Sequence, residues 1–380
     1  MTHVCLGDVA REIKQKVPVD QELPTVGLEH LDPGEVELAH WDEGVETTFT
    51  KAFSKGQVLF GRRRAYLRKA AVAPFDGICS GDITVIAPKD NLSPRLLPFI
   101  IQNDALFEHA ITNSAGSLSP RVKWQSLSQF EFELPSIAKQ EDLADILWTA
   151  QETRSHYRQL LTACDDVVKS QFVEMFGEPA ENPKGWETSS LTSLGSCKNG
   201  MNFKSKESGI ELPCLGVGDF KDRSVINDVS EMGRINLDDE PAEGYFLKDG
   251  DIVFVRSNGN KELVGRCLAV YPHGEKAVFS GFCIRLRVES DKVRIPYLIW
   301  ALKQPSMRQQ MFGRGANVQN LNQKLMAKVD VPIPPLAEQD RFLALVSIVD
   351  KSKFAVQKAL DELNATTKKI LNQELGLGDV

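Results

Sequence analysis

Five basic side chains and one aromatic side chain follow the short apolar run Gln57–Phe60. These residues are Arg62, Arg63, Arg64, Tyr66, Arg68 and Lys69. An arginine guanidinium can donate two parallel hydrogen bonds to O6 and N7 of a guanine, or to the oxygens of a phosphate. The segment therefore predicts a contact with DNA, and a solvated surface turn is the alternative.

A second segment, in the other half of the chain, carries amides in place of most of the arginines. It is Arg256-Ser257-Asn258-Gly259-Asn260-Lys261, and it follows the apolar run Asp251–Val255. Asparagine amides pair with N6 and N7 of adenine, and glycine lets the backbone approach a ligand closely. We predict base contacts here as well, although Asn-Gly is also a common hairpin turn.

The charges around the first segment are separated by sign. Residues 17–50 contain nine carboxylates and no Lys or Arg, whereas residues 51–75 contain seven Lys or Arg and no carboxylate. The whole chain has a net charge of −7, and binding to phosphates needs local positive charge. The separation predicts one basic surface on an acidic body, and the alternative is a solvated charged face.

Motifs that would indicate catalysis are missing from the sequence. There is no N-P-P-[YF] or D-P-P-Y tetrapeptide for adenine methylation, no G-x-G-x-x-G or G-x-x-x-x-G-K-[ST] loop for nucleotides, and no H-E-x-x-H. We therefore predict a non-catalytic chain that has no catalytic residue, no metal site and no cofactor of its own.

The cysteines and the hydropathy pattern bear on the cellular compartment. Seven cysteines are scattered without a C-x-x-C pair, which favours reduced thiols in a cytoplasm over disulfides or a zinc site. The first residues lack the pattern of a signal peptide. No uncharged apolar stretch reaches about 18 residues, so we expect no membrane span.

An internal repeat organises the chain. Five pairs of segments match in the same order: Glu22–Gly27 with Glu211–Gly216, Lys55–Arg62 with Asp249–Arg256, Ser80-Gly81 with Ser280-Gly281, Leu134–Gln140 with Ile333–Gln339, and Phe176-Gly177 with Leu375-Gly376. Each half begins with short β-type runs, continues with a short amphipathic helix near Pro94–Ile111 or Ile295–Phe312, and ends in about 40 residues without internal Gly or Pro. The halves predict two globules and two long helices, at 1–135, 136–177, 178–334 and 335–376.

Both long segments carry a seven-residue pattern that is typical of a helix seam. In the first segment one line holds Leu143, Ala150, Tyr157, Cys164 and Gln171, and a second line holds Ile146, Thr153, Leu160, Val167 and Glu174. In the second segment the lines hold Phe342, Val349, Val356, Leu363 and Ile370, and Leu345, Ser352, Ala359, Thr366 and Gln373. We predict an antiparallel coiled coil of the two helices. The alternative is that each helix binds a partner protein, and both can hold on different faces.

Two similar but diverged globules suit a long ligand with two different sites. Duplex DNA is such a ligand, because its grooves recur every ~34 Å and a rigid spacer then fixes the half-site spacing. The predicted fold class is therefore α+β, with two similar α/β globules separated by two long helices that pack as an antiparallel coiled coil in a pseudo-twofold tandem repeat.

The L-P-x-x-x-x-Q segment before each long helix, with G-x-[IV]-[LV]-F-x-[RS] upstream, resembles the specificity subunits of type I restriction-modification systems. The resemblance covers nearly the whole chain. It implies two target-recognition domains, each recognising one half of a bipartite asymmetric sequence in double-stranded DNA. It also implies binding of two modification (methyltransferase) subunits to the helices, and further restriction (motor-nuclease) subunits. S-adenosylmethionine, ATP and Mg²⁺ are expected on those partners, where the target adenine is flipped out and methylated.

Two glycine-containing polar loops resemble a loop of that family that lies near the DNA. They are Ser114–Arg121, leading into Lys123, and Arg314–Asn320, leading into Lys324. We predict phosphate contacts by Ser117, Arg121, Lys123, Arg314, Asn317, Asn320 and Lys324. Two alternatives from other classes remain open, a protein-protein scaffold and a diverged nuclease or methyltransferase.

Overall fold

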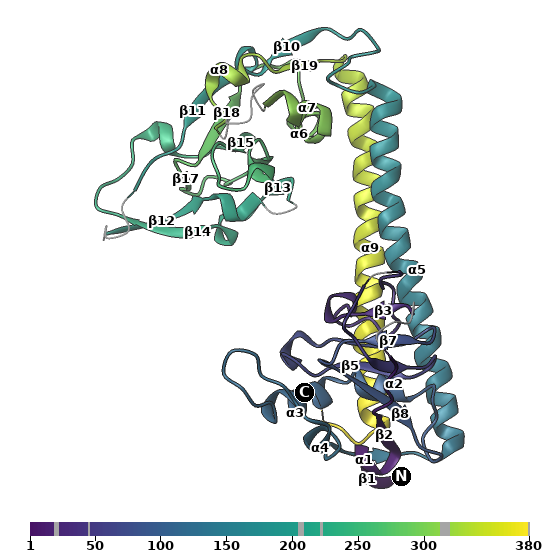
Figure 1. The fold of residues 1–380 in the computed structure, drawn as a ribbon. Helices are drawn as coiled ribbons and strands as arrows, with labels where there is room; N and C mark the ends of the chain where they lie inside the picture. Colours follow the sequence, from purple (N-terminus) through teal and green to yellow (C-terminus); the bar gives the residue numbers. More distant parts are fainter. Residues whose placement is uncertain (19–22, 45, 204–208, 221–222, 312–319, 379–380) are drawn as a thin grey trace. The chain divides into compact units, whose positions relative to one another are not determined.

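The structure is a computed structural model that describes residues 1–18, 23–44, 46–203, 209–220, 223–311 and 320–378. The chain divides into two compact units (Figure 1). Unit 1 consists of Met1–Leu161 and Phe354–Val380, and unit 2 consists of Thr162–Lys353. Each unit contains part of both long helices. The predicted division into four consecutive segments therefore differs from these units, and it stays a prediction.

The described residues of unit 1 form three small sheets and four short helices besides the parts of the long helices. The four-stranded sheet has the order β2 (Ala10–Ile13), β8 (Ile83–Pro88), β5 (Val58–Gly61), β6 (Ala70–Val72), and the three-stranded sheet has the order β3 (Thr25–Val26), β7 (Gly77–Cys79), β4 (Lys51–Phe53). The remaining elements are the pair β1 (Thr2–Cys5) and β9 (Glu131–Leu134), the helices α1 (Leu6–Val9), α2 (Leu97–Ile101), α3 (Asp104–Thr112) and α4 (Trp124–Leu127), and the 3-10 turns η1 (Leu28–His30) and η2 (Ala65–Leu67). The core lies between α2, α3 and the larger sheet, where the Phe60 and Phe107 rings stack with centroids 5.5 Å apart.

Unit 2 repeats this plan. Its larger sheet has the order β11 (Gly195–Asn199), β18 (Cys283–Val288), β15 (Asp251–Val255), β16 (Cys267–Val270), β13 (Val225–Ile226), and its smaller sheet has the order β14 (Gly233–Leu237), β12 (Ile210–Leu215), β17 (Val278–Phe279). The other elements are the pair β10 (Thr188–Ser190) and β19 (Asp330–Pro332), the helices α6 (Ile295–Lys303), α7 (Pro305–Met311) and α8 (Gln323–Met326), and the 3-10 turns η3 (Leu191–Ser193), η4 (Val217–Phe220), η5 (Val229–Glu231), η6 (Glu243–Tyr245) and η7 (Lys261–Leu263).

The strand registers confirm the repeat residue by residue. In unit 1, Val26 of β3 lies parallel to Cys79 of β7. In unit 2, Leu215 of β12 lies parallel to Phe279 of β17. The sequence alignment of Glu22–Gly27 with Glu211–Gly216 pairs the same positions. The fold class predicted from the sequence, α+β with a tandem repeat, is therefore confirmed.

The single short helix predicted in each half is two helices. Asn103 interrupts the first one, because its side chain accepts a hydrogen bond from the Ala105 amide at 2.8 Å and thereby caps α3. In unit 2, Pro305 begins α7 directly after α6 ends. Asparagine at an N-cap and proline at the first helical turn are both start signals for a helix.

The two long helices, α5 (Ile137–Phe176) and α9 (Leu336–Glu374), run antiparallel in both units (Figure 1). In unit 1, Leu143 at the start of α5 shares a core with Leu371 near the end of α9. In unit 2, the end of α5 packs against the start of α9, since the ring centroids of Phe176 and Phe342 lie 5.5 Å apart. Antiparallel packing of the helices, as predicted, is thus found within each unit.

One line of the predicted seam is wrong in α5. The predicted second line lies three residues after the first line, but its members Ile146, Leu160 and Val167 are 51%, 46% and 53% exposed. The side chains that turn inward lie four residues after the first line, and they are Leu147, Arg154, Leu161, Val168 and Met175. A helix has about 3.6 residues per turn, so both spacings return to the same side. The arginine at position 154 made the correct line look less apolar than the wrong one.

The same correction applies to α9. Of the predicted second line, Ser352, Thr366 and Gln373 are exposed, whereas Leu345 and Ala359 are partly buried. The inward line lies four residues after the first and holds Val346, Lys353, Leu360, Thr367 and Glu374. Lys353 pairs across the seam with Asp165, at 2.5 Å between Nζ and Oδ1.

The repeated L-P-x-x-x-x-Q segment has a structural explanation. The Gln140 side chain is 1% exposed; its Oε1 accepts from the Ser93 amide at 2.8 Å, and its Nε2 donates to the Pro135 carbonyl at 2.9 Å. Gln339, which is fully buried, makes the same two bonds to the Arg294 amide and the Pro334 carbonyl at 2.7 and 2.8 Å. Each glutamine thus attaches the start of a long helix to its own unit.

No helix in the described part of the chain is long and apolar enough to cross a membrane. The seven cysteines are free thiols. Burial raises the pKa of Cys79, Cys214 and Cys267 to about 12, so these three thiols are protonated and unreactive near neutral pH.

Candidate nucleic-acid interface

Two of the sequence-predicted segments of unit 1 lie side by side. We call them the first loop (62–69) and the second loop (114–121). The Arg64 amide donates to the Pro120 carbonyl at 2.8 Å, and the Val122 amide donates to the Arg62 carbonyl at 3.0 Å. Segments about fifty residues apart in the sequence therefore form one continuous surface.

Asp82, which the sequence analysis did not single out, connects the two loops. Its carboxylate accepts two hydrogen bonds from Arg121, at 2.7 and 3.1 Å, and lies 3.5 Å from Nη1 of Arg63. The hydrogen bonds from Arg121 hold the pKa of Asp82 below its usual value. Arg63 also donates to the Ser119 hydroxyl, at 3.1 and 3.3 Å. One carboxylate thus orders two arginines, and the trio keeps a net positive charge.

The tip of the first loop carries the exposed members of the predicted set. Arg64 is exposed, and Tyr66 is 52% exposed beside Leu67 at 42%. Arg64 and Arg68, on either side of η2, have left-handed backbones with φ of 54° and 52°. Non-glycine residues in this conformation store strain, and such strain is concentrated at functional sites.

Arg68 and Lys69 have partners inside unit 1. Arg68 pairs with Asp104 and with Glu108, the latter at 2.6 Å. The Lys69 ammonium donates to the Leu28 carbonyl at 2.7 Å. The two side chains therefore hold the base of the first loop against α3 and η1, and their predicted contact with DNA stays a prediction.

The second loop presents an apolar tip among polar residues. Leu118 is 89% exposed between the predicted contact Ser117, itself exposed, and Ser119. Lys123, also exposed, follows the loop and precedes α4.

Unit 2 arranges its first loop (256–261) by the same backbone contacts. The Arg256 amide donates to the Phe282 carbonyl at 2.8 Å, as the Arg62 amide does to the Asp82 carbonyl at 3.0 Å. The Leu321 amide donates to the Arg256 carbonyl at 2.8 Å, and Ser257 pairs with Asn320 in an antiparallel bridge. The first loop of unit 2 thus lies beside the end of its second loop (314–320).

In the two predicted asparagines of this loop, the side-chain oxygen accepts a hydrogen bond from the backbone. Oδ1 of Asn258 accepts from the Asn260 amide at 2.8 Å, and Oδ1 of Asn260 accepts from the Glu262 amide at 3.0 Å. Their amide nitrogens remain the groups that can donate to a ligand. Lys324 and Asn320 are exposed. Arg314, Asn317 and the side chain of Lys261 lie outside the described residues.

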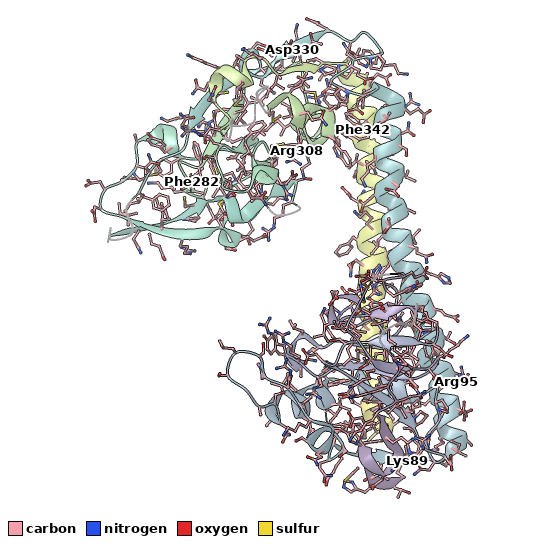
Figure 2. The ribbon with its side chains drawn as sticks, in the orientation of Figure 1. Lys89, Arg95, Phe282, Arg308, Asp330 and Phe342 are labelled. Atoms are coloured by element: carbon pink, nitrogen blue, oxygen red, sulfur yellow. The ribbon has the colours of Figure 1, made fainter. Side chains whose placement is uncertain are left out.

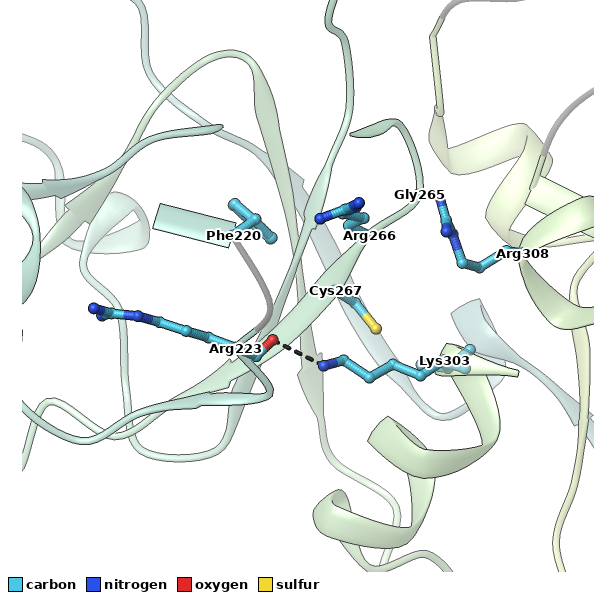
Figure 3. Close-up of a pocket in the computed structure, with 8 residues that line it drawn as sticks. Phe220, Arg223, Gly265, Arg266, Cys267, Lys303 and Arg308 are labelled. Carbon is cyan, nitrogen blue, oxygen red and sulfur yellow. Dashed lines mark hydrogen bonds between the residues drawn. The ribbon is translucent and has the colours of Figure 1, made fainter. Parts of the chain in front are cut away.

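A cavity of about 240 Å³ in unit 2 has a basic lining (Figure 3). Its lining includes Arg223, Arg266, Lys303 and Arg308, together with Phe220 and Cys267. Arg266 and Arg308 converge on the Glu262 carbonyl, at 3.3 Å from Nε and 2.7 Å from Nη2. Guanidinium groups beside a candidate base-contacting loop suit phosphate oxygens. No local sequence pattern marks this set of basic residues, because its members are spread over 86 positions, from 223 to 308.

A duplicated α+β body, in which each copy holds a loop that begins with arginine against a tight turn, is the architecture expected of a nucleic-acid-binding protein with two similar units. The family model for the type I restriction modification DNA specificity domain matches residues 2–159 and 183–373. The chain therefore belongs to that family, and the family domain occurs twice in it.

Curated relatives carry the same assignment. The specificity subunit of the type I restriction enzyme StySPI from Salmonella potsdam is 24% identical over 340 residues, which is 84% of this chain and 72% of that one. The EcoKI specificity subunit of Escherichia coli is 25% identical over 70% of this chain and 62% of its own length.

Solved structures share the fold. A chain from a structure of a type I restriction-modification system is 20% identical, with a TM-score of 0.65 over 100% of this chain and 98% of that chain. The S subunit from M. genitalium is 15% identical, with a TM-score of 0.55 over 100% of this chain and 96% of that chain. The predicted function, a DNA specificity subunit of a type I restriction-modification system, is confirmed by the family match and the curated relatives. The individual DNA-contacting residues stay predictions.

Proposed function

We propose that each unit of this chain recognises one half of a bipartite, asymmetric DNA site and that the chain itself performs no chemistry. The observation that carries the proposal is the repeat of one backbone arrangement with different side chains. In both units, the residue after β5 or β15 is held by the carbonyl of a tight turn, at Asp82 or Phe282. The side chains around that point differ, so the two half-sites differ in sequence.

The proposed partners are two modification subunits and, beyond them, restriction subunits. The part of α5 in unit 1 offers a contact surface, since Ile146 and Leu160 are each about half exposed at an interval that returns to one face of the helix. S-adenosylmethionine would be bound by the modification subunits, and ATP and Mg²⁺ by the restriction subunits. We place the complex in the cytoplasm, where free thiols such as Cys79 persist.

Binding to DNA as a function of salt tests the recognition role. The assembled complex with its modification subunits should lose affinity linearly in log–log form as salt rises, with a slope of about −0.9 for each phosphate neutralised. Arg64→Ala and Arg256→Ala should weaken binding to the specific site, whereas Arg341→Ala, an exposed arginine on α9, should not. Salt-independent binding, or equal loss in all three variants, would reject the role.

A methyl-transfer assay tests the absence of catalysis. The chain alone, supplied with S-adenosylmethionine and duplex DNA, is expected to transfer no methyl group, and addition of the modification subunits is expected to restore transfer. Transfer by the chain alone would reject the non-catalytic role and favour a diverged methyltransferase.

The long helices are proposed to set the spacing between half-sites. A copy of residues 155–161 inserted after Leu161, with a copy of 350–356 inserted after Val356, keeps the seam in phase and lengthens both helices. Seven residues add roughly 10 Å at about 1.5 Å per residue. The unspecified spacer should therefore grow by one to about three base pairs, at ~34 Å per helical turn of DNA. Methylation mapping that returns the original spacer would reject this role.

A further inference from the structure

Phe282 is an exposed aromatic residue in a rigid turn of unit 2 (Figure 2). The turn joins β17 to β18, and the Phe282 side chain is 62% exposed although Phe279 and Cys283 on either side are fully buried. A single exposed apolar side chain is common on protein surfaces. Phe282 differs from such residues in two respects, which are the hydrogen bonds of its turn and the chemistry of the equivalent turn in unit 1.

The backbone of the turn is held from three sides. The Cys283 amide donates to the Ser280 carbonyl at 2.8 Å, and the Gly281 amide donates to the Met201 carbonyl at 2.7 Å. Nη1 of Arg256 donates to the Gly281 carbonyl at 3.2 Å. The aromatic ring is therefore presented on a fixed backbone, which lowers the entropy that a contact through it would cost.

The turn also belongs to the candidate interface. The Phe282 carbonyl accepts from the amides of Arg256 and Ser257 at 2.8 and 3.2 Å, and these are the first two residues of the first loop. Ser257 in turn pairs with Asn320 of the second loop. The exposed ring thus stands where the predicted DNA-contacting segments of unit 2 meet.

The equivalent turn in unit 1 has the same backbone hydrogen bonds, but it carries an acidic side chain in place of the aromatic ring. The Ile83 amide donates to the Ser80 carbonyl at 3.0 Å, and the Arg62 amide donates to the Asp82 carbonyl at 3.0 Å. Asp82 uses its carboxylate to hold Arg63 and Arg121. Phe282 has no carboxylate that could accept hydrogen bonds from an arginine, so this position contributes an apolar surface in unit 2.

We propose that Phe282 makes an apolar contact with one base of the half-site recognised by unit 2 and thereby determines specificity at that base pair. The inference rests on the proposed function. Apolar side chains discriminate bases through contact with the C5-methyl group of thymine. A neutral ring also releases no counterions, so its contact contributes to sequence preference and leaves the salt dependence unchanged.

The test uses the full chain assembled with its modification subunits and a duplex that carries its mapped methylation site. Competitor duplexes replace each base pair of both half-sites in turn. A further duplex carries uracil in place of thymine at the sensitive position. In the Phe282→Ala complex, discrimination should fall about tenfold at one position of one half-site. Phe282→Leu should retain part of it, and the salt slope should equal that of the unsubstituted complex.

Ile210→Ala is the matched control, because Ile210 is a 40% exposed apolar residue on β12 of the same unit. It should change neither half-site. Unchanged discrimination in Phe282→Ala, or an equal loss for every sequence, would overturn the inference, since the latter would mean that Phe282 contacts a protein partner or the DNA backbone. Failure of the proposed function is distinguishable, because the unsubstituted complex would then show no sequence preference.

Discussion

The two units use one backbone arrangement to build two different surfaces. In unit 1, exposed apolar side chains stand at the tips of both loops, on Tyr66, Leu67 and Leu118, and the turn between β7 and β8 supplies the carboxylate of Asp82. In unit 2, the corresponding turn supplies the exposed ring of Phe282. The backbone of the turn holds the first residue of the first loop in both units, through the Asp82 or the Phe282 carbonyl. The side chain of the turn can therefore differ between the units, and in unit 1 it adds an ion pair with Arg63.

The smaller sheets show that the variation extends beyond side chains. In unit 1, the third strand, β4, pairs with β7, whereas in unit 2 the third strand, β14, pairs with β12. The central parallel pair is retained in both units. The two units therefore share the parallel pair of strands that leads into each turn, and they differ in the edge strand of the smaller sheet.

Replacement of residues 1–134 by the first globule of another specificity subunit should have the largest effect. The half-site assigned to unit 1 should change entirely, and affinity for the original site should fall roughly a thousandfold or more. The other half-site should stay the same, because unit 2 has its own core. Methylation mapping in a host measures both halves at once. A change in both half-sites would end the assignment of one unit to one half-site.

Substitution of the buried glutamines tests whether the two units hold the long helices in the same way. Gln140→Leu and Gln339→Leu each leave backbone groups without their side-chain partner in a buried site, at a cost of about 2 to 4 kcal/mol in the free energy of unfolding. Urea denaturation measures this cost. Gln159→Leu, on the exposed surface of α5, is the control and should cost less than about 0.5 kcal/mol. A large cost in one unit and none in the other would break the equivalence.

Substitution of Asp82 tests what the turn does in unit 1. Asp82→Asn removes the charge that orders Arg63 and Arg121, so discrimination at the half-site of unit 1 should fall about tenfold, or ~1.4 kcal/mol. Competition binding with single base-pair replacements measures it. Asp90→Asn, at an exposed site, is the control. Equal discrimination before and after the substitution would mean that the two arginines are positioned without the carboxylate.

The acid stability of the same variant gives an independent measurement. The pKa of Asp82 is lowered in the folded chain from an ordinary value of 3.8, mainly by the hydrogen bonds from Arg121. Its contribution to stability is therefore fully present above pH 3.8 and is lost as the pH falls through the lowered folded value. The difference in unfolding free energy between the unsubstituted chain and Asp82→Asn should be constant near neutrality and should shrink in strong acid. A difference that grows in acid would contradict the assigned direction.

The sequence predicted the repeat, the long antiparallel helices and both first loops, because each leaves a local pattern. It misassigned the second line of the seam, since Arg154 interrupts the correct one with a charge and Ile146 improves the wrong one. Asp82 and Phe282 had a usable signal, as they directly follow the matched pair Ser80-Gly81 and Ser280-Gly281. The basic cavity had none, because residues distant in the sequence meet there only through the fold.

The basic cavity of unit 2 gives the comparison between the units with the smallest expected effect on DNA binding. Arg266 occupies the position of Lys69, since their carbonyls accept from the equivalent amides of Val255 and Gly61 at 2.9 and 2.8 Å. The Lys69 ammonium is bonded to the Leu28 carbonyl, whereas Arg266 lines the cavity with Arg308. If the cavity holds a DNA phosphate, Arg266→Ala and Arg308→Ala should each reduce the salt slope by about one and weaken binding roughly fivefold for all sequences alike.

Lys69→Ala should change the slope less than Arg266→Ala, because its charge is turned toward η1. Arg234→Ala, which removes an exposed arginine of β14 that pairs with Glu211, is the control and should leave the slope unchanged. Equal slopes in Arg266→Ala and in the control would exclude a phosphate from the cavity. Equal slopes in Arg266→Ala and Lys69→Ala would show instead that both units hold the DNA backbone at this position, so that they would differ only in how they recognise bases.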